Sequence, residues 1–244
     1  MRRQVFAFSG VLEPRPGERG NRPLLEHVLA LGAARRSDDP GPVRLCYVPT
    51  AVGDDPAAVS AYRRVFGGRD DVVLTVLTLF PQPSLPDVRA HLLTQDVVLV
   101  EGGSVVNLMA VWRAHGLPAV LRECWEAGVV LAGPSAGSLC WHVGGPTDSW
   151  SDRLDPFTDG LALLPHSNGV HDDLAGQPRR STYRRLVASG ALPGGYATED
   201  GVGLHYLGTE LLEAVTARPG ARAWRVDPDG AGGFTERPVP AREI

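Results

Sequence analysis

The 244-residue chain contains no lysine, so all 24 of its cationic side chains are arginines. Without lysine it has no Schiff-base nucleophile, no phosphate-binding lysine of the Walker or kinase type and no Ser–Lys dyad. Its 28 acidic residues give a net charge of −4, which offers no electrostatic footprint for nucleic acid or an anionic membrane surface. We therefore expect neither of these as a partner.

Cysteine is also scarce. Cys46, Cys124 and Cys140 form no CxxC pair, so neither a disulfide framework nor a structural zinc site is expected. No apolar run approaches the roughly 18 residues that a membrane span needs. The N-terminal stretch lacks the long apolar segment of a secretory signal. We expect a cytoplasmic protein.

Short apolar runs alternate with amphipathic stretches in the first half of the chain, which is typical of βαβ units around a mostly parallel sheet. The predicted strands are Val5–Val11, Val43–Val48, Val72–Leu77, Val97–Val100 and Val129–Ala132. The predicted helices are Leu24–Ala34, Ala57–Phe66, Leu85–Leu93, a helix from Val105 that ends at Gly116, and Ala119–Ala127. Length and the lack of repeats or linkers predict one domain, residues 1–244.

The second half is predicted to be less regular. Trp141–Gly160 is expected to be a loop, Leu161–Leu164 a strand, Thr182–Ser189 a helix and Asp227–Gly233 a surface turn. Short strands are predicted at Tyr196–Thr198, Val202–Tyr206, Glu213–Ala217 and Ala223–Val226.

The clearest chemical motif is Gly133-Pro134-Ser135-Ala136-Gly137, between a predicted strand and a helix. Glycines on either side of a serine let the backbone make a tight, strained turn that leaves the hydroxyl exposed. Backbone N–H groups at the helix start, such as that of Ala136, can stabilise a developing oxyanion. Ser135 is therefore a candidate nucleophile.

A nucleophilic serine needs a base. His27, His91 and His115 fall in predicted helices and are interpreted as surface residues. Of the histidines further along the chain, His171 lies in a polar turn, where catalytic side chains concentrate. His205 alternates like a strand residue, which indicates a packed side chain, and His142 is too close to Ser135 on one helix to reach back to it.

The partner of the base remains open at this point. The available carboxylates are Asp148, Asp172, Asp173, Glu199 and Asp200, and spacing alone does not choose among them. A metal site from His166, His171, Asp172 and Asp173 is the rival interpretation, but this pattern is not a recognised ligand spacing. We expect no metal and no organic cofactor.

Several segments, taken in order, resemble the peptidase E family of the S51 serine peptidases. They are Gly102-Gly103-Ser104, the serine motif extended to Ser138, Thr147-Asp148-Ser149, Gly160 to Pro165, and Ala197-Thr198-Glu199-Asp200-Gly201. The resemblance spans Gln4 to Val226. It implies a class I glutamine amidotransferase-like, flavodoxin-like α/β fold with three layers, in which helices cover both faces of a mostly parallel central sheet.

The resemblance also implies roles for single residues. Ser135 matches the nucleophile, His171 the base and Asp200 the orienting carboxylate, with Asp148 as the second choice for that carboxylate. Gly103 and Ala136 match the amides of the oxyanion hole. Arg179 matches an arginine that recognises the aspartyl carboxylate of the substrate, and Arg180 is the alternative. Val170 and Pro134 depart from the proline and tryptophan of peptidase E and put the specificity for aspartyl dipeptides in question.

The leading hypothesis is a serine peptidase that hydrolyses short peptides, including dipeptides with N-terminal aspartate, as a monomer or homodimer. One alternative is an α/β-hydrolase esterase, for which Ser135, Asp172 and His205 have the required chain order. The other is a non-catalytic, amidotransferase-like domain that binds a small ligand.

Overall fold

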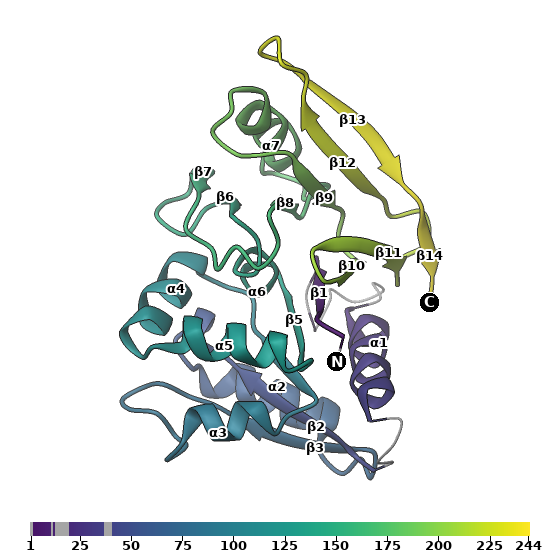
Figure 1. Cartoon of the computed structure of the whole chain (residues 1–244). Coiled ribbons are helices and arrows are strands. Elements are labelled where there is room, and N and C mark those ends of the chain that lie inside the picture. Colours follow the sequence, from purple (N-terminus) through teal and green to yellow (C-terminus); the bar gives the residue numbers. More distant parts are fainter. Residues whose placement is uncertain (1, 11, 13–19, 37–40) are drawn as a thin grey trace.

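A computed structural model describes residues 2–10, 12, 20–36 and 41–244. Its main sheet has the strand order β14-β11-β10-β1-β5-β4-β2-β3 (Figure 1). The five parallel strands are β1 (Gln4–Phe8), β5 (Val130–Pro134), β4 (Val97–Val100), β2 (Val43–Val48) and β3 (Val72–Val76). Beyond β1 lie β10 (Val202–Leu207), β11 (Glu210–Thr216) and β14 (Ala241–Glu243). The first predicted strand extends to Val11, which is outside the described residues.

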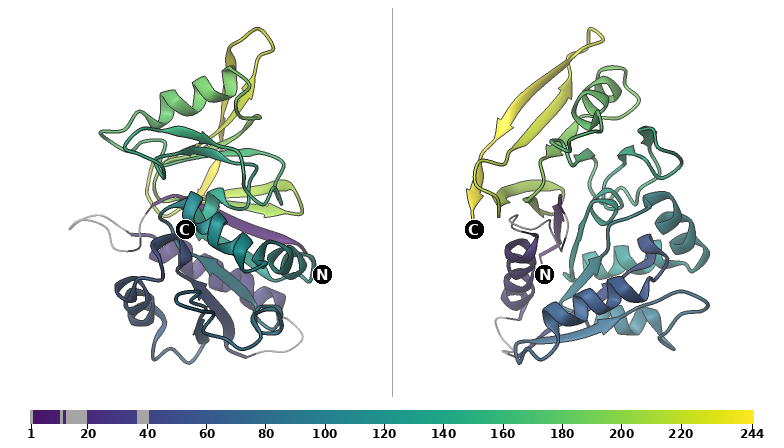
Figure 2. Two further views of the ribbon diagram at one scale, coloured as in Figure 1. Left: turned by 90° about the vertical axis from the view of Figure 1, so that its left-hand side faces the viewer. Right: turned by 180° about the vertical axis from the view of Figure 1, so that it is seen from behind.

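Helices cover both faces of this sheet (Figure 2). One face packs against α1 (Arg22–Arg35) and α2 (Pro56–Phe66), and the other against α3 (Val88–Leu93), α4 (Val105–Ala114) and α5 (Leu117–Glu126). Because both faces are buried at the centre of the sheet, strands such as β4 are continuous apolar runs. The predicted three-layer α/β fold is confirmed.

Local sequence explains where several helices begin. The Asp55 carboxylate accepts a hydrogen bond from the Ala57 N–H, and Asp87 and Ser104 accept from Ala90 and Asn107 in the same way. These side chains satisfy backbone donors that have no partner within the helix. No helix in the described part of the chain has the length and apolar character to span a bilayer.

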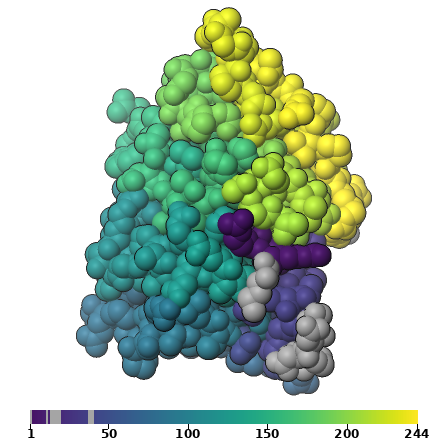
Figure 3. All heavy atoms as spheres, in the orientation of Figure 1, coloured from purple at the N-terminus to yellow at the C-terminus, as the bar shows by residue number. Residues whose placement is uncertain are grey.

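A smaller sheet lies beside the first, with strand order β13-β12-β9-β8. It comprises β8 (Ser167–Val170), β9 (Gly195–Thr198), β12 (Ala223–Pro228) and β13 (Phe234–Val239), and α7 (Arg179–Ala188) packs on it. Val170 of this sheet and Leu204 of the main sheet belong to the same apolar cluster. Figure 3 shows the C-terminal strands, in yellow, at the tip and along one side of the molecule.

The structure corrects two predictions in the second half. Leu161–Leu164 is not a strand: the N–H groups of Leu161 and Leu164 donate to the carbonyl oxygens of Cys140 and Trp141, so this segment wraps around the chain after α6 (Ala136–Leu139). The predicted loop Trp141–Gly160 contains a short hairpin, β6 (Gly145–Thr147) and β7 (Asp155–Phe157). These strands are too short and too rich in glycine and proline to show a period-two apolar pattern.

Candidate active site

Ser135 occupies the turn between β5 and α6. Its backbone has φ 53° and ψ −112°, which is a strained conformation for a residue with a Cβ. The Ser135 N–H donates to the carbonyl oxygen of Phe8 at 3.0 Å. A Cβ on Gly133 or Gly137 would lie 2.5 or 2.3 Å from the carbonyl oxygen of Val100, so the turn requires both glycines.

His171 and Asp200 follow two neighbouring parallel strands, β8 and β9, whose last residues Val170 and Thr198 are paired. Because parallel strands end at the same edge of a sheet, the two side chains meet there. Nδ1 of His171 lies 2.5 Å from Oδ1 of Asp200. The structure thus joins these two predicted residues, which are far apart in sequence.

Ser9, at the end of β1, was not predicted to belong to the site. Its buried hydroxyl accepts a hydrogen bond from the His171 N–H at 3.2 Å and lies 2.7 Å from the Thr198 hydroxyl. Phe8 and Ser9 are consecutive, so one strand end supports the backbone of both Ser135 and His171. A polar residue directly after a buried parallel strand was the available sequence signal.

The loop Gly102–Gly103 follows β4 and packs closely against Ser135. A Cβ on Gly102 would lie 3.3 Å from Cβ of Ser135, and one on Gly103, whose φ is 130°, would lie 2.5 Å from the carbonyl oxygen of Ala51. Among the described residues, no hydrogen bond engages the backbone N–H of Gly103 or of Ala136. These two amides are therefore free to donate to a group bound beside Ser135.

Glu101 is a second residue that sequence reasoning missed. One carboxylate oxygen accepts from the Gly102 N–H at 2.8 Å, and the other accepts from the Tyr47 hydroxyl. Burial raises the pKa of Glu101, although the hydrogen bonds from Tyr47 and Gly102 oppose that shift. Tyr47 in turn stacks on Tyr62 with ring centroids 4.0 Å apart. This buried cluster fixes the peptide group that begins the glycine loop.

Asp148 contacts Arg179, not His171. Its Oδ2 lies 3.0 Å from Nη2 of Arg179 and 3.0 Å from Nε2 of Gln177. Burial raises the pKa of Asp148, but the Gln177 hydrogen bond and the Arg179 charge outweigh it, so the pKa lies below its usual value. The next residue, Ser149, accepts from the Val105 N–H at 3.0 Å, which places this pair beside the helix that follows Gly103.

The structure separates Arg179 from Arg180. Arg179 is 6% exposed, and its Nε donates to Oε1 of Gln177 at 2.7 Å. Arg180 instead pairs with Asp172 at 3.2 Å and Glu236 at 2.8 Å, on the side of α7 that faces β13. Only Arg179 of the two therefore contacts the segment beside the glycine loop.

The side chains of the alternative esterase triad have other partners. Asp172 is paired with Arg184 and Arg180, and burial raises its pKa despite these charges. His205 Nε2 lies 3.0 Å from Oε1 of Gln4. The rival metal set also fails: in the described residues, His166, His171, Asp172 and Asp173 do not converge into a group of metal-ligand atoms.

A five-stranded parallel core with helices on both faces, and a strained serine turn at the end of β5, define a three-layer α/β protein with a candidate nucleophile at the carboxyl edge of its sheet. The family model for peptidase family S51 matches residues 20–214. The chain therefore belongs to peptidase family S51, and it is a serine-type peptidase.

Individual relatives agree with this placement. A Bacillus subtilis (strain 168) protein described as the uncharacterized peptidase YgaJ is 38% identical over 186 residues, which cover 75% of this chain and 77% of the relative. A solved peptidase from an acI-B1 actinobacterium has a TM-score of 0.68 at 15% identity, covering 99% of this chain and 95% of that one. A candidate peptidase E from Listeria monocytogenes EGD-e has a TM-score of 0.60 at 17% identity, covering 89% and 100%.

Proposed function

We propose that this peptidase hydrolyses short peptides with Ser135 as the nucleophile, His171 as the general base and acid, and Asp200 as the carboxylate that orients His171. The hydrogen bond between His171 and Asp200 carries the proposal, because it provides the oriented imidazole that a serine nucleophile needs. The shared support of Ser135 and His171 by the end of β1 adds to it.

In this mechanism Asp200 accepts a hydrogen bond from the protonated Nδ1 of His171, which leaves Nε2 as the base. Nε2 takes the hydroxyl proton while Oγ of Ser135 attacks the scissile carbonyl carbon. The imidazolium then protonates the leaving amine, the C–N bond breaks and an acyl-enzyme remains. Water, deprotonated by the same Nε2, hydrolyses that ester and restores the serine. The N–H groups of Gly103 and Ala136 donate to the oxyanion in both steps.

Arg179 is proposed to recognise an acidic side chain at the N-terminus of the substrate. Guanidinium groups bind carboxylates well, most strongly through two hydrogen bonds. Here Nη2 of Arg179 already donates a hydrogen bond to Asp148, and Nε of Arg179 donates one to Gln177. An acidic substrate must therefore bind through Nη1 or displace Asp148, so the preference for N-terminal aspartate is moderate.

The test is a panel of dipeptides and longer peptides that differ in the N-terminal residue, including aspartyl and isoaspartyl forms, with Ser135→Ala alongside. We expect cleavage of short peptides that is abolished in the variant, and a preference for N-terminal aspartate that is lost in Arg179→Met and kept in Arg180→Met. Hydrolysis of p-nitrophenyl esters without cleavage of any peptide would instead favour the esterase hypothesis. Binding of an acidic ligand without any hydrolysis would favour the non-catalytic one.

A further inference from the structure

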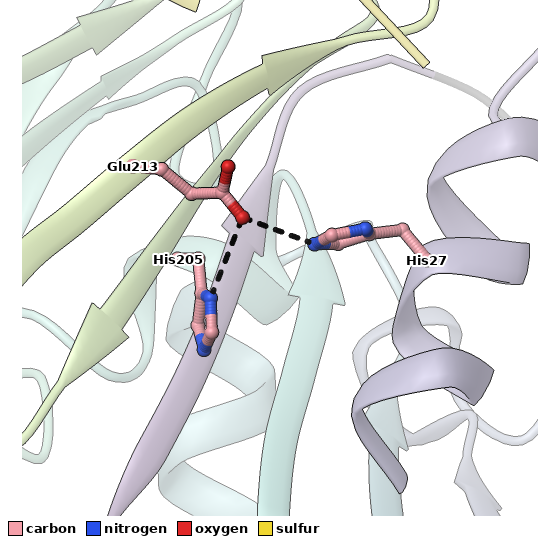
Figure 4. Close-up of side chains that lie close together, drawn as sticks. All are labelled: His27, His205 and Glu213. Carbon is pink, nitrogen blue, oxygen red and sulfur yellow. Dashed lines mark ion pairs between the residues drawn. The ribbon is translucent and has the colours of Figure 1, made fainter. Parts of the chain in front are cut away.

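A group of three side chains outside the proposed catalytic site has its ligand atoms directed toward one point. His205 on β10 and Glu213 on β11 are register partners in adjacent antiparallel strands, and His27 reaches them from α1 (Figure 4). Oε1 of Glu213 lies 3.9 Å from Nδ1 of His205 and 3.9 Å from Nε2 of His27. All three ligand atoms lie within 4.8 Å of one another.

The two imidazole nitrogens in this group lack hydrogen-bond partners among the described residues. Nδ1 of His205 and Nε2 of His27 are both buried and unpaired, and His205 as a whole is 5% exposed. Nε2 of His205 donates a hydrogen bond to Oε1 of Gln4 at 3.0 Å, which leaves a lone pair on Nδ1. A buried polar atom without a partner is unusual and calls for an explanation.

The charged groups around these three side chains favour the binding of a cation. Arg242 donates to Oε2 of Glu213 at 2.9 Å and leaves Oε1 facing the histidines. The Nδ1 atom of His205 thus faces Oε1 of Glu213 at 3.9 Å, while its Nε2 contacts Gln4. A cation placed there would be bound by all three groups.

We propose that His27, His205 and Glu213 bind a divalent transition-metal cation of the Zn²⁺ class. Two imidazole nitrogens and one carboxylate oxygen are typical ligands of such ions, and the Gln4–His205 hydrogen bond is the outer contact that orients a metal-binding histidine. Metal–ligand bonds of about 2.0–2.2 Å require the side chains to close in from their present separation. Glu213 has the most freedom to do so, since its side chain is 31% exposed.

The site joins one helix to two strands, so its role is structural. His27 is near the start of α1, and a surface pocket lined in part by Arg22, His27 and Ile244 adjoins it. A bound ion would tie α1 to the β10–β11 edge and leave a coordination position for water. The three ligands make no hydrogen bond or ion pair with Ser135, His171 or Asp200 among the described residues, so the ion takes no part in peptide hydrolysis.

Calorimetric titration of tag-free, chelator-treated protein with Zn²⁺ tests the proposal. We expect one equivalent to bind, at least tenfold more weakly in Glu213→Gln and His205→Ala, and unchanged in His115→Ala, which alters an exposed histidine of α4's C-cap. The melting temperature should rise with Zn²⁺ in the wild type and not in the two ligand variants. His27→Gln, at the more exposed of the two histidines, provides the same test if His205→Ala fails to fold.

Three results would overturn this proposal. The wild type could show no saturable binding, or the Glu213 and His27 variants could bind as tightly as the wild type. Binding could also be lost in His171→Ala and retained in Glu213→Gln, which would place the ion at the proposed catalytic pair. Circular dichroism of each metal-free variant establishes that it is folded, and the visible spectrum of the Co²⁺ form reports independently on the ligand set.

Discussion

Nδ1 of His171 lies 2.5 Å from Oδ1 of Asp200, although the two residues are 29 positions apart in the sequence. The paired ends of β8 and β9 set this relationship, because His171 follows the last residue of β8 and Asp200 lies two residues after the last residue of β9. The arrangement fixes which imidazole nitrogen carries the proton and which is available as a base. The hydrogen bond that the His171 N–H donates to the Ser9 hydroxyl holds the same turn against β1.

The first prediction separates the two carboxylates proposed for the catalytic set. Asp200→Asn should lower kcat by about 10³–10⁴-fold, since an amide favours the wrong tautomer of the histidine. Asp148→Asn should leave kcat nearly unchanged, because Asp148 contacts Arg179 and Gln177. Steady-state kinetics on one cleaved peptide measure both. A larger loss of kcat in Asp148→Asn than in Asp200→Asn would reverse the assignment.

The second prediction concerns Ser9 as a positioning residue. Ser9→Ala should lower kcat by roughly ten- to a hundredfold through displacement of His171, with KM unchanged. It should also reduce the free energy of unfolding by about 1–3 kcal/mol, because buried donors lose their acceptor. Thr198→Val is the matched control: it removes the other partner of Ser9 but not the His171 contact. Equal kcat values for both variants would show that Ser9 has only a structural role.

The third prediction follows from the ion pair between Arg179 and Asp148. If Asp148 competes with an acidic substrate for the guanidinium, Asp148→Asn should lower KM for peptides with N-terminal aspartate and have little effect on peptides with N-terminal alanine. Arg179→Met should raise KM for the aspartyl peptides alone. The measurement is KM for peptides with N-terminal aspartate and for peptides with N-terminal alanine, in each variant. A uniform change in both series would argue against recognition of the acidic side chain by Arg179.

The fourth prediction uses His142, which is buried three residues after the end of α6. Burial lowers its pKa from 6.5 to about 4, and its ring nitrogens bond to the Ser138 carbonyl and the Tyr206 hydroxyl. The folded state thus holds His142 neutral, and its contribution to stability is complete above pH 6.5. As the pH falls from 6.5 to about 4, the unfolded state takes up the proton first, and about 3 kcal/mol of stability is lost.

Urea unfolding of the wild type and His142→Gln, measured between those two pH values, isolates this contribution. The other histidines are common to both proteins, so they cancel in the difference. We expect the stability difference between wild type and variant to shrink as the pH falls. A difference that stays constant with pH would mean that His142 is not held neutral in the folded state.

The sequence predicted the parts of the molecule that depend on local chemistry. The glycine-flanked serine could be predicted because its turn excludes a Cβ at Gly133 and Gly137. The parallel strands could be predicted because burial on both faces of the central strands makes them predominantly apolar. By contrast, β8 has the sequence Ser-Asn-Gly-Val, and its place in the sheet depends on partners such as Ser138, whose hydroxyl donates to Asn168.

Several residues of the candidate site could not be assigned from sequence alone, because contacts between distant segments determine which side chains meet. Asp148 and Asp200 are both plausible carboxylates by position, and only the pairing of β8 with β9 distinguishes them. Ser9 and Glu101 lie at the ends of β1 and β4, but their partners are distant in sequence. His27, expected at the surface of a helix, has a side chain that is only 15% exposed because α1 packs against the edge formed by β10 and β11.

The most direct test of the central claim is mass-spectrometric mapping of the protein after reaction with a fluorophosphonate, which labels activated serines. We expect a single adduct on Ser135, no adduct in Ser135→Ala, and much slower labelling in His171→Ala and Asp200→Asn than in Asp148→Asn. An unlabelled wild type, or an adduct that persists in Ser135→Ala, would contradict Ser135 as the nucleophile and the site built around it.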